Sequence, residues 1–161
     1  MEKNVAQLLN DQINKELYSA YLYLDMSNYY EDEGLSGFAA WYRKQAEEEQ
    51  EHAMKIYDYL HDNGEKVTLE AIAKPALTYA TITDPAKEAL KHEQYVTSLI
   101  HNLYAAAVKA EDYRTQQFLA WFITEQGEEE KNARDIVDEL AFCAQDKAAL
   151  YLMNSRMGSR D

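Results

Sequence analysis

The stretch Gly64–Pro85, GEKVTLEAIAKPALTYATITDP, sets the topology of the chain because it joins two strongly helical segments and has no helical period itself. Gly64 is a helix stop signal, and Asp84-Pro85 predicts a helix start with Asp84 as the cap. About 20 extended residues can span about 65 Å, whereas a helix of about 27 residues is about 40 Å long. The stretch can therefore run the length of the preceding helix, so the next helix starts parallel to it.

Four long helical segments and one short segment surround this crossover. In the first, Ile13, Leu17, Ala20 and Leu24 follow helical spacing, and in the second we expect Ser36 to be the N-cap. The expected helices cover residues 5–30, 36–63, 85–111, 114–142 and 146–153. Short connections after the first and third helices make their neighbours antiparallel. We therefore predict an all-α, four-helix bundle with one long crossover and a short fifth helix, in a single domain over residues 1–161.

Composition narrows the function. The formal net charge is −13, from 29 acidic and 16 basic residues, which disfavours nucleic-acid and anionic-lipid partners and attracts cations. The single cysteine, Cys143, excludes an intramolecular disulfide and a thiolate metal cluster. The N-terminus has no signal-peptide core, and no apolar run reaches membrane-spanning length. We expect a cytoplasmic protein without a membrane partner.

Each of the four long helices carries a carboxylate on its apolar stripe, close to mid-length. The interruption of the first stripe is Glu16, and the second stripe holds both Glu49 and His52. The third and fourth stripes are interrupted by Glu93 and by Gln126 with Glu129, respectively. Their apolar neighbours are Ile13, Ala20 and Tyr23; Tyr42, Ile56 and Leu60; Leu90, Val96 and Ile100; and Leu119, Phe122, Ala133, Ile136 and Leu140.

Acids that converge inside a bundle need a cation, because each desolvated charge costs several kcal/mol. No lysine or arginine lies on the four stripes, so a multivalent metal ion is the expected partner. Glu49-x-x-His52 places an oxygen and a nitrogen ligand one turn apart on one helix face. Carboxylates with one imidazole suit iron or manganese better than structural zinc, and the ligands do not distinguish those two metals.

Several of these features are weak when taken singly. An isolated Glu-x-x-His usually marks a surface ion-pair spacing, and runs such as Glu47–Glu49 and Glu128–Glu130 are usually solvated. His92 is expected off the stripe, at the surface, and most of the 13 tyrosines are expected to pack in the core. The sequence favours a metal centre because all four long helices carry a carboxylate on the apolar stripe near mid-length.

The sequence resembles the non-haem ferritins of bacteria and archaea over nearly its whole length. The matching residues are Asn14–Tyr23 (NKELYSAYLY), Gln45–His52 (QAEEEQEH), His92–Gln94 (HEQ), Phe118–Phe122 (FLAWF) and Thr124–Lys131 (TEQGEEEK). Ferritin-like di-iron proteins are themselves a known example of carboxylates and Glu-x-x-His motifs inside a four-helix bundle. The resemblance implies an enzyme, a ferroxidase that oxidises Fe(II) with O2 or peroxide, and storage of ferric mineral inside a 24-subunit homo-oligomeric shell.

The resemblance also implies roles for individual residues. One iron would be held by Glu16, Glu49 and His52, and Glu49 would bridge to a second iron. That second iron would be held by Glu93 and Glu129, with Gln126 close by. A third iron would fall on Glu48, Glu125, Glu128 and Glu129. Tyr23 and Trp121 would supply electrons during oxygen reduction.

Departures from related families narrow the resemblance further. Gln50 stands where bacterioferritins carry their haem-ligating Met, so we expect no haem. Gln126-x-x-Glu129 replaces the second Glu-x-x-His of bacterioferritins and rubrerythrins, and the Cys-rich rubrerythrin domain is absent from the sequence. The tail Met157–Asp161 is too short and too mixed in charge to serve as the basic tail of a DNA-protecting mini-ferritin. Two alternatives stay open, a non-catalytic metal-binding bundle and a di-iron oxidase of an organic substrate.

Overall fold

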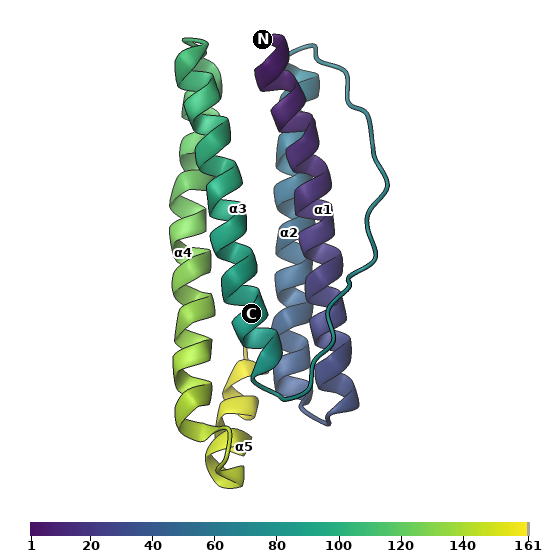
Figure 1. The fold of residues 1–161 in the computed structure, drawn as a ribbon, viewed down its shortest axis with the longest axis vertical. Helices are drawn as coiled ribbons and strands as arrows, with labels where there is room; N and C mark the ends of the chain where they lie inside the picture. Colours follow the sequence, from purple (N-terminus) through teal and green to yellow (C-terminus); the bar gives the residue numbers. More distant parts are fainter. Residues whose placement is uncertain (161) are drawn as a thin grey trace.

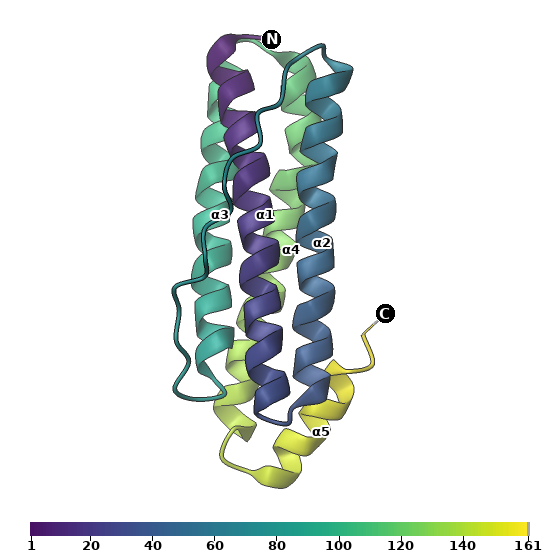
Figure 2. The same ribbon diagram turned by 90° about the vertical axis from the view of Figure 1, so that its right-hand side faces the viewer.

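The computed structural model describes residues 1–160, which contain five helices and no strand (Figure 1). The helices are α1 (Lys3–Asp32), α2 (Ser36–Asp62), α3 (Asp84–Lys109), α4 (Tyr113–Cys143) and α5 (Lys147–Met157). The first four form a bundle and α5 packs across one end of it, against α2 and α4 (Figures 1 and 2). The predicted fold class is confirmed. The fifth helix ends at Met157, four residues beyond its expected end.

The crossover between α2 and α3 runs along the outside of the bundle from one end to the other (Figures 1 and 2). Asn10 of α1 fastens it through two hydrogen bonds to the Thr68 backbone, of 3.0 Å to the carbonyl and 2.8 Å from the N–H. Near its far end, the hydroxyl of Tyr30 donates to the Ile82 carbonyl at 2.7 Å. These anchors let an irregular segment start α3 parallel to α2.

The start of α2 is capped from another helix. The prediction that Ser36 is the N-cap was wrong, because Ser36 is already helical and no local side chain caps the helix. Instead, Asn154 Oδ1 of α5 accepts from the N–H groups of Gly37 and Phe38, at 2.9 and 3.1 Å. A Cβ atom on Gly37 would lie only 1.7 Å from the Asn154 carbonyl oxygen. Glycine at this position therefore lets α5 dock on α2.

Aspartates order the starts of α3, α4 and α5 in two different ways. The prediction that Asp84 is a helix cap was wrong: its carboxylate accepts from the N–H groups of Ala80 and Thr81, at 2.8 and 2.9 Å, in the preceding turn. These bonds lower the pKa of Asp84. Asp112 and Asp146 do cap α4 and α5, each accepting from the third residue of its helix.

Two apolar clusters fill the bundle, one toward each end. The cluster near α5 is rich in aromatic rings, including Tyr30, Phe38 and Tyr42. The other is mostly aliphatic, and Ile56 and Ile100 are fully buried in it. Between them lies a buried layer of Gln12, Glu16, Ser19, Gln45, Glu49, His52, Glu93, Gln126 and Glu129. No helix in residues 1–160 has the length and apolar character needed to cross a membrane.

Candidate metal centre

The four stripe carboxylates meet in the polar layer, one from each long helix. Their exposed fractions are 1% for Glu16 and Glu93, 2% for Glu49 and 4% for Glu129. Each lies on the helix face that carries the core residues of its own helix. No lysine or arginine of residues 1–160 forms an ion pair with any of them. The structure therefore places four acids together without a lysine or arginine partner.

Glu16, Glu49 and His52 form the first potential ligand group. Ligand atoms of these three residues all lie within 4.8 Å of one another. His52 Nδ1 is 3.4 Å from a Glu49 oxygen and 3.9 Å from a Glu16 oxygen. Two turns of α2 and the facing turn of α1 thus supply two carboxylates and one imidazole to one point.

Glu49, Glu93 and Glu129 form a second group with ligand atoms within the same 4.8 Å. Glu49 belongs to both groups, so its two oxygens can serve two adjacent metal ions. Gln126 lies beside this group, and its Nε2 donates to a Glu93 carboxylate oxygen at 3.1 Å and reaches Thr97 Oγ1 at 3.2 Å. The side chains of both groups, together with Gln126, thus permit two neighbouring metal ions that share the Glu49 carboxylate.

Two glutamines that sequence reasoning did not assign support the carboxylates. Gln12 Nε2 donates to Glu16 Oε1 at 2.8 Å, and Gln45 Nε2 donates to Glu129 Oε2. Gln12 precedes Glu16, and Gln45 precedes Glu49, by four residues, which puts each glutamine one turn away on the same helix face. That spacing is the signal by which sequence reasoning could have identified them.

The electrostatics of the layer favour a multivalent cation. Burial, reinforced by neighbouring carboxylates, raises the pKa of Glu49 well above its usual range and the pKa of Glu129 to about 8. Burial also raises the pKa of Glu93 to about 7. Glu16 Oε2 and Glu49 Oε1 are buried and have no hydrogen-bond partner. Native proteins rarely leave such oxygens unsatisfied. Because both belong to the cluster of four acids, they are suited to be metal ligands.

The four acids expected to hold a third iron are only partly gathered. Glu125 and Glu129 join His52 in a third group whose ligand atoms lie within 4.8 Å of one another. Burial, with a smaller contribution from nearby Glu48, raises the pKa of both Glu125 and Glu129. The Glu48 carboxylate itself is paired with Arg160 at 2.6 Å. Glu128 is exposed and belongs to none of the three groups.

The two expected redox aromatics flank the centre. The hydroxyl of Tyr23 donates to a Glu93 carboxylate oxygen, and the ring is 1% exposed. Burial and the carboxylate beside it hold the pKa of Tyr23 well above its ordinary value. Trp121 lies edge-on to His52 with ring centroids 5.3 Å apart, while Lys55 Nζ sits 4.2 Å above the indole. Trp121 is 40% exposed, so it lies between the centre and the surface.

His92 was expected at the surface, and that expectation was wrong. The side chain is half-buried between α3 and α1, where its Nε2 is 2.7 Å from Ser19 Oγ. Desolvation lowers the pKa of His92 to about 4, so the imidazole is neutral at neutral pH. The cause of the error is Ser19, a small residue on α1 that leaves room for the imidazole.

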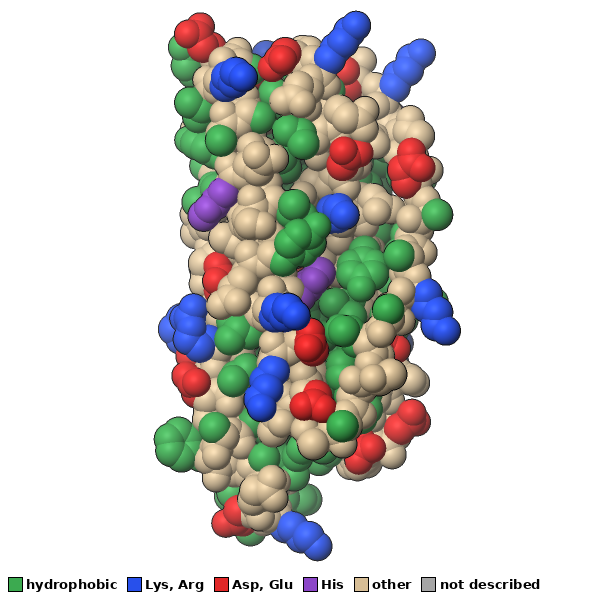
Figure 3. Space-filling model, in the orientation of Figure 1, with side chains coloured by type: hydrophobic (Ala, Val, Ile, Leu, Met, Phe, Trp, Pro, Cys, Tyr) green, Lys and Arg blue, Asp and Glu red, His purple; other side chains and the backbone are tan. Residues whose placement is uncertain are grey.

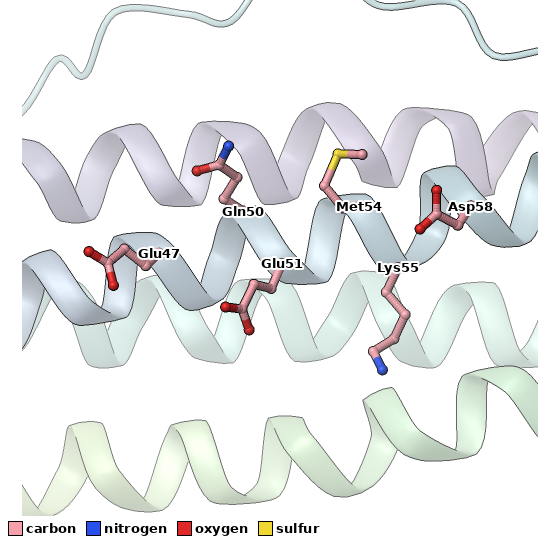
Figure 4. A pocket seen from close by; sticks show the side chains of 6 residues that line it. All are labelled: Glu47, Gln50, Glu51, Met54, Lys55 and Asp58. Carbon is pink, nitrogen blue, oxygen red and sulfur yellow. The ribbon is translucent and has the colours of Figure 1, made fainter. Parts of the chain in front are cut away.

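The surface of the molecule offers hollows that do not belong to the centre. One shallow hollow is lined by α2 alone, and Figure 4 shows its six side chains projecting from that helix. Its residues are Glu47, Gln50, Glu51, Met54, Lys55 and Asp58. Acidic and basic side chains are interspersed on the face shown in Figure 3, so no single acidic patch covers that face. The buried layer, rather than a surface pocket, is the candidate site.

The chain is similar to known proteins both in sequence and in structure. Residues 6–143 match the ferritin-like domain family. Bacterial non-heme ferritins from Staphylococcus aureus and Staphylococcus haemolyticus are 37% and 38% identical over 160 residues, which cover 99% of this chain and 96% of each relative. An open-pore ferritin from the archaeon Archaeoglobus fulgidus has a TM-score of 0.98 and 38% identity, with 100% of this chain and 99% of that chain covered. The chain therefore belongs to the ferritin family, among the non-haem ferritins of bacteria and archaea.

Proposed function

We propose that the buried layer is a two-metal ferroxidase centre that oxidises Fe(II) to Fe(III) with O2 or peroxide, and that the protein stores the product as ferric mineral. The observation that carries this proposal is the pair of unpartnered buried oxygens, Glu16 Oε2 and Glu49 Oε1, among four carboxylates that have no lysine or arginine partner. The names of the relatives, bacterial non-heme ferritins, support iron as the metal.

In this proposal the protein binds two Fe(II) ions as substrate. Glu16 and His52 hold one ion, Glu93 and Glu129 hold the other, and Glu49 holds both. Gln126 donates to Glu93 and so fixes the orientation of that ligand. Because Glu93 and Glu129 have raised pKa values of about 7 and about 8, cation binding displaces their protons near neutral pH.

Electron supply and a third ion extend the proposal. Tyr23 contacts Glu93 and Trp121 contacts His52, so each aromatic is one residue removed from a substrate ion. Both are therefore proposed to donate electrons when the oxidant is reduced. A third iron is proposed on Glu125 and Glu129, completed by Glu48 and Glu128 when these side chains turn toward it.

Assembly into a homo-oligomeric shell, with 24 subunits as the proposed number, is supported by an apolar face. Leu24, one of the apolar residues at helical spacing in the first segment, is 47% exposed, and Tyr21 and Ile72 beside it are 49% and 42% exposed. With Leu17, Ala20 and Ala46, these residues line a groove between α1, α2 and the crossover. Burial of such a patch against another copy removes apolar surface from water.

The experiment for the oxidation centre is stopped-flow absorbance after aerobic addition of Fe(II). The protein should give a fast rise of ferric absorbance, and Glu49→Ala and His52→Ala should each slow it roughly tenfold or more. Glu51→Ala is the matched control, because it removes an exposed carboxylate of the same helix outside the centre. Equal rates in all four proteins would contradict the site assignment.

The same mixing experiment separates the two alternatives. A non-catalytic metal-binding bundle would bind Fe(II) without the fast rise of ferric absorbance. An oxidase of an organic substrate would need that substrate for sustained turnover, whereas a ferroxidase needs only Fe(II) and the oxidant. Gel filtration after iron loading tests storage, since the shell must elute far above the 18.6 kDa of one chain and carry iron with it.

A further inference from the structure

The last described residues return from α5 along the face of α2 that leads to the centre. Figure 2 shows this tail beside the lower part of α2. Its path begins where Gly158 meets Gly37, so closely that a Cβ on Gly158 would lie 3.1 Å from the Gly37 Cα. The tail then reaches Trp41, Gln45 and Glu48, which occupy successive turns of one α2 face. The tail is thus directed toward the polar layer.

Arg160 ends this path with four contacts to α2. Its guanidinium lies 4.4 Å from the Trp41 ring centroid and donates to the Trp41 carbonyl at 3.3 Å. It donates to Gln45 Oε1 at 2.9 Å and to Glu48 Oε2 at 2.6 Å. Arginine presents several donors in one plane and stays charged at all ordinary pH values, so it can hold two acceptors at once.

The contact with Gln45 connects the tail to the centre. Because Arg160 donates to the amide oxygen of Gln45, the amide nitrogen must point the other way, where it donates to Glu129. Glu129 belongs to two of the three potential ligand groups. Arg160 therefore helps to orient a carboxylate that it does not touch.

The contact with Glu48 places a positive charge where a third metal ion would need a ligand. Glu48 acts electrostatically on both Glu125 and Glu129, which shows that the three carboxylates share one region. Arg160 is the only lysine or arginine among residues 1–160 that forms an ion pair with Glu48. A metal ion bound through Glu48 would have to displace this guanidinium.

We propose that Arg160 is a positioning residue that stands in for a cation at Glu48, so that the third metal site is completed only when the C-terminal tail releases this carboxylate. The inference rests on the proposed third site and adds what controls its filling. In the closed state Arg160 holds Glu48 and orients Gln45 toward Glu129. In the open state Glu48 turns to join Glu125 and Glu129 around the ion.

Calorimetric titration with Zn2+, which undergoes no redox reaction, measures the competition without any turnover. The protein should bind two Zn2+ ions tightly and a third more weakly. Arg160→Gln should tighten the third binding step roughly fivefold, the effect of removing one partly exposed ion pair, and leave unchanged the binding of the ion held by Glu16, Glu49 and His52. Arg160→Lys keeps the charge but loses the planar guanidinium. Its affinity for the third Zn2+ ion should lie between those of the unaltered protein and Arg160→Gln.

Arg156→Gln is the matched control because it removes the same charge from the same end of the chain. Arg156 pairs with Glu139 on α4, outside the polar layer. The Arg156→Gln variant should bind the third Zn2+ ion with the same affinity as the unaltered protein. Glu48→Gln should abolish the third step and keep the first two.

Tail release has its own optical readout in Trp41. In a Trp121→Phe background, Trp41 is the only tryptophan, and its emission should change with the third equivalent of Zn2+ and not with the first two. In the Arg160→Gln variant that change should disappear, because the guanidinium no longer covers the ring.

The outcomes separate this inference from the proposed function. A third Zn2+ step of equal affinity in the unaltered protein, Arg160→Gln and Arg156→Gln would overturn the role of Arg160 and leave the two-metal centre in place. Two steps in every variant would overturn the third site together with its control by the tail. No tight Zn2+ step at all would overturn the centre itself.

Discussion

Glu49 destabilises the metal-free fold and is at the same time the carboxylate shared by two potential ligand groups. It is 2% exposed, one of its oxygens has no hydrogen-bond partner, and burial, followed by the neighbouring Glu93, Glu16 and Glu129, raises its pKa. A buried carboxylate with three acidic neighbours destabilises the metal-free fold. In the proposed centre, two bound cations would turn this repulsion into attraction, so that the unfavourable interactions are relieved only when both ions are bound.

Replacement of Glu49 by its neutral isostere should therefore affect stability and metal binding in opposite directions. Without metal at pH 8, Glu49→Gln should raise Tm, because the amide stays neutral at every pH and donates to its acidic neighbours. For a chain of this length each kcal/mol corresponds to about 2–4 °C. With saturating Zn2+, the rise in Tm on metal addition should be smaller in Glu49→Gln than in the unaltered protein. Paired calorimetric scans would show it, and a lower metal-free Tm in the variant would contradict it.

The stability of the metal-free protein should fall as pH rises from about 6.5 to 8. The pKa values of Glu93 and Glu129, about 7 and about 8, exceed the value of about 4.3 in an unfolded chain. The folded state therefore holds more protons in this window, and the free energy of unfolding decreases with pH. Below about pH 6.5, His92 acts oppositely, since its folded pKa of about 4 is depressed and acid favours the unfolded chain.

Denaturant titrations at several pH values would measure this dependence. Glu129→Gln removes one of the titrating groups, so its stability should depend less on pH between 6.5 and 8. Excess Zn2+ should reverse the trend, because deprotonated carboxylates bind the ion more tightly. A metal-free stability that increases steadily from pH 6.5 to pH 8 would be incompatible with buried protonated carboxyls.

The attachment of α5 to α2 depends on two particular residues. Asn154 supplies the missing cap of α2, and Gly37 leaves space for the Asn154 backbone. The same attachment starts the path that leads the tail to Glu48. Local changes at the α2–α5 contact should therefore reach the polar layer through Arg160.

Two glycine-to-alanine substitutions in helices should change stability in opposite directions. Gly37→Ala should be destabilising, because its Cβ would meet the Asn154 carbonyl oxygen at 1.7 Å and force α5 from α2. Gly127→Ala should stabilise by up to about 1 kcal/mol, because no atom lies within 4 Å of its added Cβ and alanine favours helix. Thermal unfolding of both variants checks this, and a Gly37→Ala protein as stable as Gly127→Ala would show that α5 does not need this close approach.

Sequence reasoning succeeded where the relevant interactions are periodic along one helix. The apolar stripes and the stop and start signals at Gly64 and Pro85 predicted the bundle and the crossover. It failed where partners are remote: Asn154 caps a helix more than 100 residues away, and Ser19 from α1 creates the site for His92. Arg160 belongs to the same class, because nothing in the local pattern of the tail indicates Glu48.

The whole molecule positions the centre by layering. Two apolar clusters close the bundle above and below the polar layer, so water reaches the four carboxylates poorly and their mutual repulsion stays strong. The external crossover makes α3 parallel to α2, which brings Glu93 to the height of Glu49. The exposed groove along α1 and α2 lies on the outer surface, where it is available for the proposed contacts between copies.

Anomalous diffraction from crystals of the assembled protein soaked in Zn2+ examines the two-metal centre at the level of single ligands. We expect two strong peaks within each subunit, one among Glu16, Glu49 and His52 and the other among Glu49, Glu93 and Glu129, with Glu49 contacting both. Peaks confined to surface carboxylates such as Glu47 or Glu51, with the polar layer empty, would contradict the central role assigned to the four buried acids.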